Sequence, residues 1–166
     1  ASNSMSITAD ISRGTIYDCN MQPLVNEDKS TYIAIKPSIS ALSQASGVIS
    51  PEEQNKAYER ISGGKIGVVK ATGNFSNENA VTFTKTNRYQ DDGLCVHLIG
   101  YTDADGNGVS GIEKYYNDLL KKSSGTIKIS CPVDAKGNIL AGGEIKTVND
   151  GYGTAAGLML TVDKDI

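Results

Sequence analysis

The acidic stretch Asp103–Gly108 has the residue types that open a calcium-binding loop. It reads Asp-Ala-Asp-Gly-Asn-Gly, so side-chain oxygens occupy positions 1, 3 and 5 and a glycine occupies position 6. A hard cation takes such oxygen ligands, and the glycine permits the sharp turn. Position 12, which should be a bidentate glutamate, is Lys114. Two interpretations therefore stay open: a calcium site, or an Asx-rich turn that leads into a helix.

Two other groups have the residue types of nucleophilic catalysis. Ser62 and Lys65 match the S-x-x-K spacing of penicillin-interactive serine enzymes, but the two glycines between them indicate that a helix ends there. His97, the only histidine, follows Cys95 at the i, i+2 spacing of one strand face, where direct hydrogen bonds are rare. We therefore expect no catalytic residue, no metal and no cofactor in this chain.

The composition indicates a domain with a packed globular core and argues against nucleic acid as a partner. The 166 residues are 39% hydrophobic and 21% charged, with a net charge of −3. Phosphate binding needs a basic face, so nucleic acid is excluded as a partner. The odd cysteine count (Cys19, Cys95 and Cys131) predicts buried free thiols rather than a disulfide framework.

Helix signals occur at two places, and a weaker pattern covers 38–47. Ser50, Pro51 and Glu53 predict a helix start, and Gly63–Gly64 its end. Ser110 and Glu113 form a second capping-box pattern. Apolar residues follow it at helical spacing and predict one amphipathic helix: Ile112, Tyr115, Tyr116, Leu119 and Leu120.

Strand patterns occupy most of the remaining chain. Residues 14–18 and 31–36 are expected to pair, and the other predicted strands are 65–70, 81–86, 94–101, 127–133, 139–148 and 157–162. Strands and helices alternate without a βαβ rhythm. The predicted fold class is therefore α+β, with mainly antiparallel strands and two or three helices.

Four segments, taken in order, resemble class B penicillin-binding proteins. Arg13–Asn20 resembles the R-G-x-I-x-D-R-N-G motif that opens their extracytoplasmic part. Asn87–Tyr89 and 96–101 are similar to the R-x-Y-P segment and the H-V-x-G-Y strand. Residues 108–120 are similar to the G-x-x-G-L-E helix, and 160–166 to the L-T-I-D strand that leads into the transpeptidase domain. Within the family, 94–120 resembles the penicillin-binding protein A-like subgroup of Gram-positive bacteria.

The sequence departs from the family pattern at three places. Cys19 replaces the second arginine of the first motif, Met21 replaces its glycine, and Gln90 stands where proline follows the tyrosine. The motif residues that the chain retains are expected to be structural: Arg13, Gly14, Asp18, Arg88, Tyr89, Gly111 and Glu113.

The resemblance implies a role for each part of the chain. Residues 6–156 are expected to be the non-penicillin-binding dimerisation or pedestal module, with two possible subdomains, and 157–166 a linker strand toward a downstream transpeptidase domain. Residues 1–5 are expected to be a cloning remnant. The implied parent is a membrane-anchored, serine-type D,D-transpeptidase of peptidoglycan, on the extracytoplasmic face of the membrane. Its implied partners are that downstream domain, a second copy, or other cell-wall synthesis proteins. The alternative function is a calcium-dependent adhesion or docking domain that uses Asp103–Gly108.

The motif residues also suggest a specific contact. We expect Arg13 or Arg88 to form a buried ion pair with Glu113, tying the N-terminal strand to the helix start, because breaking such a pair costs about 3–5 kcal/mol. The alternative is that Glu113 only completes its capping box, worth about 1 kcal/mol. Gly111 inside a helix costs about 1 kcal/mol relative to alanine, so its presence predicts a close approach of backbone.

Overall fold

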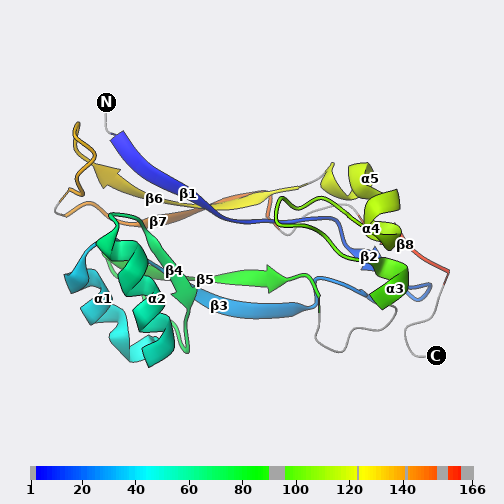
Figure 1. The fold of residues 1–166 in the computed structure, drawn as a ribbon, viewed down its shortest axis with the longest axis horizontal. Coiled ribbons are helices and arrows are strands. Elements are labelled where there is room, and N and C mark those ends of the chain that lie inside the picture. Colours follow the sequence, from blue (N-terminus) through cyan, green and yellow to red (C-terminus); the bar gives the residue numbers. More distant parts are fainter. Residues whose placement is uncertain (1–2, 90–95, 123, 141, 153–156, 162–166) are drawn as a thin grey trace. The chain divides into compact units, whose positions relative to one another are not determined.

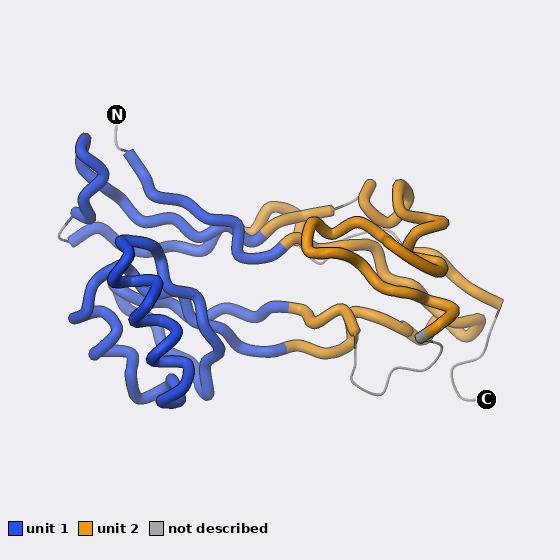
Figure 2. The backbone as a smooth tube through the Cα atoms, viewed as in Figure 1, with its two compact units in different colours: residues 1–10, 30–85, 127–148 blue, residues 11–29, 86–126, 149–166 orange. Residues whose placement is uncertain are grey.

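A computed structural model describes residues 3–89, 96–122, 124–140, 142–152 and 157–161. The chain divides into two compact units (Figure 2). Unit 1 comprises 1–10, 30–85 and 127–148, and unit 2 comprises 11–29, 86–126 and 149–166. The fold is α+β with mainly antiparallel strands, as predicted, and its described part holds five α-helices rather than two or three (Figure 1).

Unit 1 contains two three-stranded sheets and the two longest helices. One sheet has the order β4 (Gly67–Lys70), β3 (Asp28–Ile35), β5 (Ala80–Asn87). The other has the order β1 (Asn3–Ile11), β6 (Thr126–Val133), β7 (Lys146–Asp150). The helices are α1 (Ile39–Ala45) and α2 (Pro51–Ser62), joined through the 3₁₀ turn η1 (Ser46–Val48).

Helix α2 begins and ends where the sequence predicts. The Ser50 hydroxyl accepts the backbone N–H of Glu53 at 3.4 Å, and Pro51 takes the first helical turn, where its missing N–H costs nothing. Gly63 caps the other end, and Gly64 follows with φ +77°. The prediction of this helix is confirmed.

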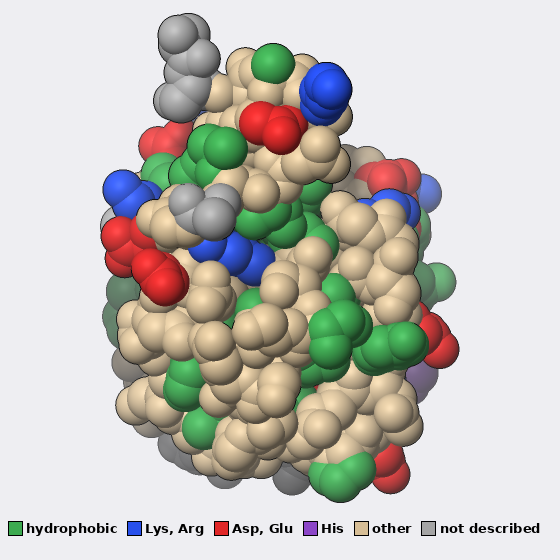
Figure 3. Space-filling model, turned by 90° about the vertical axis from the view of Figure 1, so that its left-hand side faces the viewer, with side chains coloured by type: hydrophobic (Ala, Val, Ile, Leu, Met, Phe, Trp, Pro, Cys, Tyr) green, Lys and Arg blue, Asp and Glu red, His purple; other side chains and the backbone are tan. Residues whose placement is uncertain are grey.

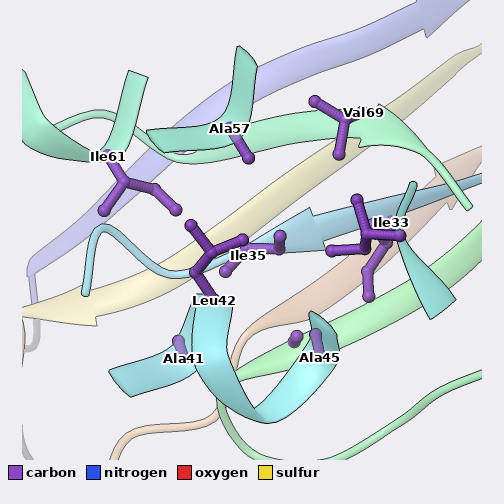
Figure 4. Packing of buried hydrophobic residues seen from close by; sticks show 10 residues of the cluster. Ile33, Ile35, Ala41, Leu42, Ala45, Ala57, Ile61 and Val69 are labelled. Atoms are coloured by element: carbon purple, nitrogen blue, oxygen red, sulfur yellow. The ribbon is translucent and has the colours of Figure 1, made fainter. Parts of the chain in front are cut away.

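The alternating side chains of β3 divide the core of unit 1. Ile33 and Ile35 pack against the helices, where Leu42 of α1 and Ile61 of α2 meet them (Figure 4). Ala34, between them in sequence, belongs to a second cluster, described next. Both faces of β3 are thus buried, because successive strand residues point to opposite faces.

The second cluster of unit 1 packs β3 residues with residues of β6. Ile129 and Cys131 are fully buried there, and Met5 and Ile7 of β1 pack against them.

On the face drawn in Figure 3, hydrophobic, charged and other side chains lie interspersed, as is usual for the surface of a folded domain.

Unit 2 is built from short elements. β2 (Ile16–Tyr17) pairs in parallel with β8 (Leu158–Met159). Three helices follow: α3 (Val96–Ile99), α4 (Gly111–Tyr115) and α5 (Asn117–Lys121). Ile16, Val25, Ile99 and Leu120 form the core of this unit.

Several predicted elements differ from the structure. Residues 14–18 and 31–36 are not partners: β2 pairs with β8, and β3 pairs with β4 in an antiparallel register. The predicted strand 94–101 is instead the helical turn α3 at Val96–Ile99, with 94–95 outside the described residues. Gly100 ends that turn at φ +79°, which suits a left-handed helix cap. Among the described residues of the predicted strand 139–148, only those at its end form regular strand, in β7.

The predicted amphipathic helix is also interrupted. It divides into α4 and α5 at Tyr116, whose ψ of +25° leaves the helical range. Tyr115 is 81% exposed, whereas Glu113 is fully buried. The charged Glu113 side chain can be buried because Arg13 and Arg88 form ion pairs with it. The apolar residues of the predicted helix therefore do not by themselves decide which face of α4 is buried.

Candidate functional site

A buried carboxylate in unit 2 lies between two guanidinium groups. The Glu113 side chain is fully buried, and the Arg13 and Arg88 side chains are only 7% and 12% exposed. Arg13 Nε lies 3.1 Å from Oε1, and Arg88 Nε lies 2.6 Å from Oε2. The sequence predicted an ion pair of Glu113 with one of the two arginines, and the structure contains both.

Arg13 connects separate segments through its remaining donors. Its Nη2 donates to the backbone oxygen of Glu113 at 2.8 Å. Its Nη1 donates to the backbone oxygen of Gly106 at 3.1 Å and to Asn117 Oδ1 at 2.9 Å. The arginine thus joins the chain before β2 to the 103–108 loop and to both short helices. Five fixed donors in a planar fork make arginine suited to this task.

Arg88 reaches the same carboxylate from the end of β5. Its Nη2 donates to Glu113 Oε1 at 2.8 Å, and its Nη1 contacts Asn26 Oδ1 at 3.3 Å. The Asn26 amide in turn donates to the Arg13 carbonyl and to Thr15 Oγ1, both at 3.0 Å. Asn26 therefore holds the two arginine segments together.

The sequence patterns did not identify two asparagines of this cluster. Asn26 has φ +65°, a left-handed conformation that asparagine tolerates better than most residues. Asn117 accepts from both Arg13 and the backbone N–H of Gly108. Each asparagine has an acidic residue directly after it, Glu27 or Asp118, and no local pattern distinguishes it from a solvated turn residue.

Tyr89 completes the coordination of the carboxylate. Its hydroxyl donates to Glu113 Oε2. Burial and this hydrogen bond to the carboxylate both raise the pKa of Tyr89 above its ordinary value. Among the described residues, no buried side-chain nitrogen or oxygen lacks a hydrogen-bond partner, so the cluster is polar but satisfied.

The electrostatics of Glu113 keep it ionised. Burial by itself raises its pKa, but the hydrogen bonds and charge of Arg88 act in the opposite direction, as do the Tyr89 hydroxyl and the charge of Arg13. The net result is a pKa below the ordinary value. Such a carboxylate is a poor proton acceptor and donor near neutral pH. The arrangement therefore suits holding segments together rather than proton transfer.

The remaining motif residues lie around this cluster and hold backbone. Gly14 is buried, and its N–H donates to the Leu120 oxygen at 2.9 Å. Asp18 is fully buried at the end of β2, where its Oδ1 accepts the N–H groups of Asn20 and Gln22. This Asx-type turn forms despite the replacements at positions 19 and 21.

The backbone conformation and surroundings of position 111 explain why α4 begins with a glycine. Its φ is +57°, and a Cβ built on it would lie 2.5 Å from the backbone oxygen of Leu98. Ser110 makes no side-chain capping hydrogen bond in the described structure. The predicted close approach is confirmed, and the interpretation of Glu113 as one half of a capping box is wrong, because its carboxylate is engaged by the arginines.

The 103–108 loop is a hydrogen-bonded turn. Asp103 Oδ1 accepts the backbone N–H groups of Asp105 and Asn107, each at 2.9 Å. Lys121 Nζ lies 2.7 Å from Asn107 Oδ1, so an ammonium already contacts one of the oxygens that calcium would need. Within the described ranges, no group of three His, Cys, Asp or Glu residues could hold a metal ion. These contacts favour the turn interpretation.

The other candidate nucleophiles are not brought together. Ser62 is the last residue of α2 and is exposed, as is Lys65 beyond the glycine pair. His97 is exposed on α3 rather than on a strand, and Cys95 lies outside the described residues. Cys131 is a buried free thiol as predicted, whereas Cys19 is exposed.

Comparison with known proteins shows which solved structures share this fold. No protein-family model matches the sequence, and no curated protein matches it significantly. Solved structures do. Penicillin-binding protein 2B from Streptococcus pneumoniae strain R6 matches with a TM-score of 0.59 at 15% identity, over 97% of this chain and 41% of that one. Penicillin-binding protein 2 from Helicobacter pylori, solved in complex with MreC, matches with a TM-score of 0.52 at 19% identity, over 99% of this chain and 37% of that one.

The chain thus spans about two fifths of the length of the penicillin-binding proteins that it matches. At such low identity the likeness concerns the fold, and it extends over nearly every residue of this chain. The four motifs predicted the same family independently of any structure. The chain therefore has the fold of one part of these penicillin-binding proteins.

Proposed function

We propose that this chain is the scaffold or dimerisation module of a membrane-anchored peptidoglycan D,D-transpeptidase. The observation that carries the proposal is the double ion pair of Glu113 with Arg13 and Arg88. It joins three of the four family motifs in one buried cluster, inside a fold shared with penicillin-binding proteins. Residues 6–156 would form the module and 157–166 the link to a serine-type transpeptidase domain.

The geometry supports a mechanical role for the motif residues. Their polar groups engage one another or the backbone, and the central carboxylate has a lowered pKa. A rigid module of this kind would hold a catalytic domain at a set distance from the membrane. It would also offer surface to other cell-wall synthesis proteins, as the Helicobacter pylori protein does to MreC in the solved complex.

The proposed location is the extracytoplasmic face of a bacterial membrane, reached through an N-terminal anchor. In the described part of the chain, no helix is long and apolar enough to cross a bilayer. The net charge of −3 gives no support to a nucleic-acid partner.

The test is the natural gene and its full-length product. We expect codons for an S-x-x-K motif within roughly the next hundred residues after Ile166, at the spacing of a serine–lysine pair. The full-length protein should then be labelled by a fluorescent penicillin, and the 166-residue chain should not. Absence of that motif, or labelling of this chain at Ser62, would refute the proposal.

A control separates loss of folding from loss of function. The Ser-to-Ala variant of the downstream motif should abolish labelling of the full-length protein. Glu113→Gln in the same protein should leave the labelled serine unchanged and lower the temperature at which labelling is lost. A scaffold role predicts this division, because Glu113 stabilises the fold and does not contact substrate.

A further inference from the structure

Asn107 and Gly108 form the only Asn–Gly pair in the sequence. An asparagine deamidates most readily before glycine, because glycine has no side chain to hinder its own nitrogen and its backbone turns freely. In this reaction the Gly108 nitrogen loses its proton to solvent hydroxide and bonds to the side-chain carbon Cγ of Asn107. The bond from Cγ to Nδ2 breaks and ammonia leaves. Water then opens the cyclic imide to aspartate or isoaspartate.

The two reacting groups of this pair are held differently. Asn107 Oδ1 accepts a hydrogen bond from Lys121 Nζ at 2.7 Å, and a cation beside a carbonyl oxygen polarises the carbon that is attacked. The Gly108 N–H donates to Asn117 Oδ1 at 2.8 Å. The nitrogen can attack only after this hydrogen bond opens, so its release limits the reaction.

Further contacts keep the backbone of Gly108 in place. A Cβ built on Gly108 would clash with the backbone oxygen of Glu113, so the backbone of α4 lies directly against this glycine. Asn117 is itself held, because its Oδ1 also accepts from Arg13 Nη1 at 2.9 Å. Rotation of the Gly108 nitrogen toward the asparagine side chain therefore requires the loop to separate from α4 and α5.

A second turn of the same kind shows what the Asn117 contact adds. Residues 103–107 and 134–138 read Asp-Ala-Asp-Gly-Asn and Asp-Ala-Lys-Gly-Asn. In each turn the first aspartate accepts the N–H groups of the third and fifth residues at 2.8–2.9 Å. The residues that flank each turn form an antiparallel bridge: Thr102 with Gly108, and Val133 with Ile139. The second turn lacks a counterpart of Asn117, since no side chain in the described ranges accepts the Ile139 N–H.

We propose that Asn107 is a deamidation site whose rate of reaction is set by Asn117. The pair stays intact while Asn117 Oδ1 holds the Gly108 N–H, and opening of this contact releases the nitrogen. As isoaspartate, the product lengthens the main chain between Gly106, whose oxygen accepts from Arg13 Nη1 at 3.1 Å, and Gly108, which lies against α4. The modified loop should therefore lose at least one of these contacts. The inference goes beyond the scaffold role and does not depend on it.

The first experiment measures deamidation of the full 166-residue chain in mildly alkaline buffer by peptide mapping with mass spectrometry. The variant Ile139→Gly places the tripeptide Gly-Asn-Gly in both turns, so the two asparagines have identical direct neighbours. In urea, where the chain is unfolded, Asn107 and Asn138 should react at closely similar rates. In native buffer Asn107 should react about fivefold more slowly than Asn138, the effect of one hydrogen bond that must open first.

The second experiment changes the acceptor in the Ile139→Gly background. Asn117→Leu removes the acceptor at similar size and should raise the rate at Asn107 about fivefold. Asn117→Asp keeps an oxygen for the Gly108 N–H and should retain the slow rate. The rate at Asn138 reports general loosening of the chain and should stay the same in every variant.

Circular dichroism checks that each variant is folded, and Asn117→Ala takes the place of Asn117→Leu if the leucine variant is not. Equal native rates at Asn107 and Asn138 would overturn the proposal. A folded Asn117→Leu chain with an unchanged rate at Asn107 would do the same, as would an Asn117→Asp chain that reacts as fast as the leucine variant.

Discussion

Arg88 holds the carboxylate of Glu113 with two parallel contacts, Nε to Oε2 at 2.6 Å and Nη2 to Oε1 at 2.8 Å. This fork-to-fork geometry is the strongest form of arginine–carboxylate contact. The two residues are 25 positions apart and belong to two different motifs. Their pairing therefore fixes the end of β5 against the start of α4, and Arg13 adds the segment before β2.

Replacement of Glu113 by glutamine should destabilise the protein strongly. The variant keeps the shape of the side chain but leaves two nearly buried guanidinium groups without a counter-charge. Breaking a buried pair in this way costs about 3–5 kcal/mol. Urea unfolding followed by circular dichroism would measure the change. Glu59→Gln, on the exposed surface of α2, is the matched control and should change stability by less than about 0.5 kcal/mol. A cost below about 1 kcal/mol for Glu113→Gln would mean that the ion pairs contribute little.

The stability that Glu113 provides should disappear in acid. Its pKa in the folded protein is lowered, since the contacts with Arg88, Tyr89 and Arg13 outweigh the effect of burial. A carboxyl whose folded pKa lies below its unfolded value, about 4.3, stabilises the fold above that pH. This contribution is lost as the pH falls through the folded pKa. The difference in unfolding free energy between wild type and Glu113→Gln should therefore be full at pH 7 and shrink below about pH 4. A difference that stays constant down to pH 2 would contradict the assignment.

Lysine should not replace Arg88 without cost. Arg88→Lys retains the charge but loses the second of the two parallel contacts, because an ammonium cannot span both carboxylate oxygens in one plane. We expect a loss of about 1.5–3 kcal/mol, the range for hydrogen bonds to charged groups. Arg60→Lys is the control, since Arg60 is exposed on α2 and donates to the Val68 oxygen, and it should cost less than about 0.5 kcal/mol. Equal losses of stability in the two variants would show that the two parallel contacts of Arg88 with Glu113 add no stability of their own.

Alanine at position 111 should destabilise the start of α4. Its backbone lies at φ +57°, and the new Cβ would lie 2.5 Å from the Leu98 oxygen. Backbone strain and the clash together should cost about 2–4 kcal/mol. Gly137→Ala separates the two causes, because Gly137 has φ +85° but open space around it, so strain alone applies at about 1–2 kcal/mol. Thermal unfolding of both variants would compare them, and equal losses would show that the contact with Leu98 yields easily.

Elements with explicit end signals were predictable. Ser50, Pro51 and the glycine pair after Ser62 delimit α2, because caps satisfy backbone groups locally and need no partner from elsewhere. The strand at Thr126–Val133 follows from alternation alone. Strand partners were not predictable in the same way. β2 pairs with β8 across more than 140 residues, and nothing within either two-residue strand specifies the other.

The helix after Ser110 shows how burial can override a pattern. The apolar spacing predicts that the tyrosines face the core, yet Tyr115 is exposed and Glu113 is buried. Hydrophobic periodicity assumes that charges prefer solvent. Here two guanidiniums and a tyrosine hydroxyl compensate the buried carboxylate, and these partners come from segments that no helical pattern can include.

The sequence by itself determined the family resemblance, the α+β class and the motif residues of the buried cluster (Arg13, Arg88, Tyr89 and Glu113), because motif order and residue type need no coordinates. Only the tertiary structure decided that Arg13 and Arg88 both contact one carboxylate, and that Asn26 and Asn117 support them. The physical reason is distance along the chain. Contacts between residues 25 to 104 positions apart depend on how the whole unit packs, whereas caps and alternating strands depend on neighbours only.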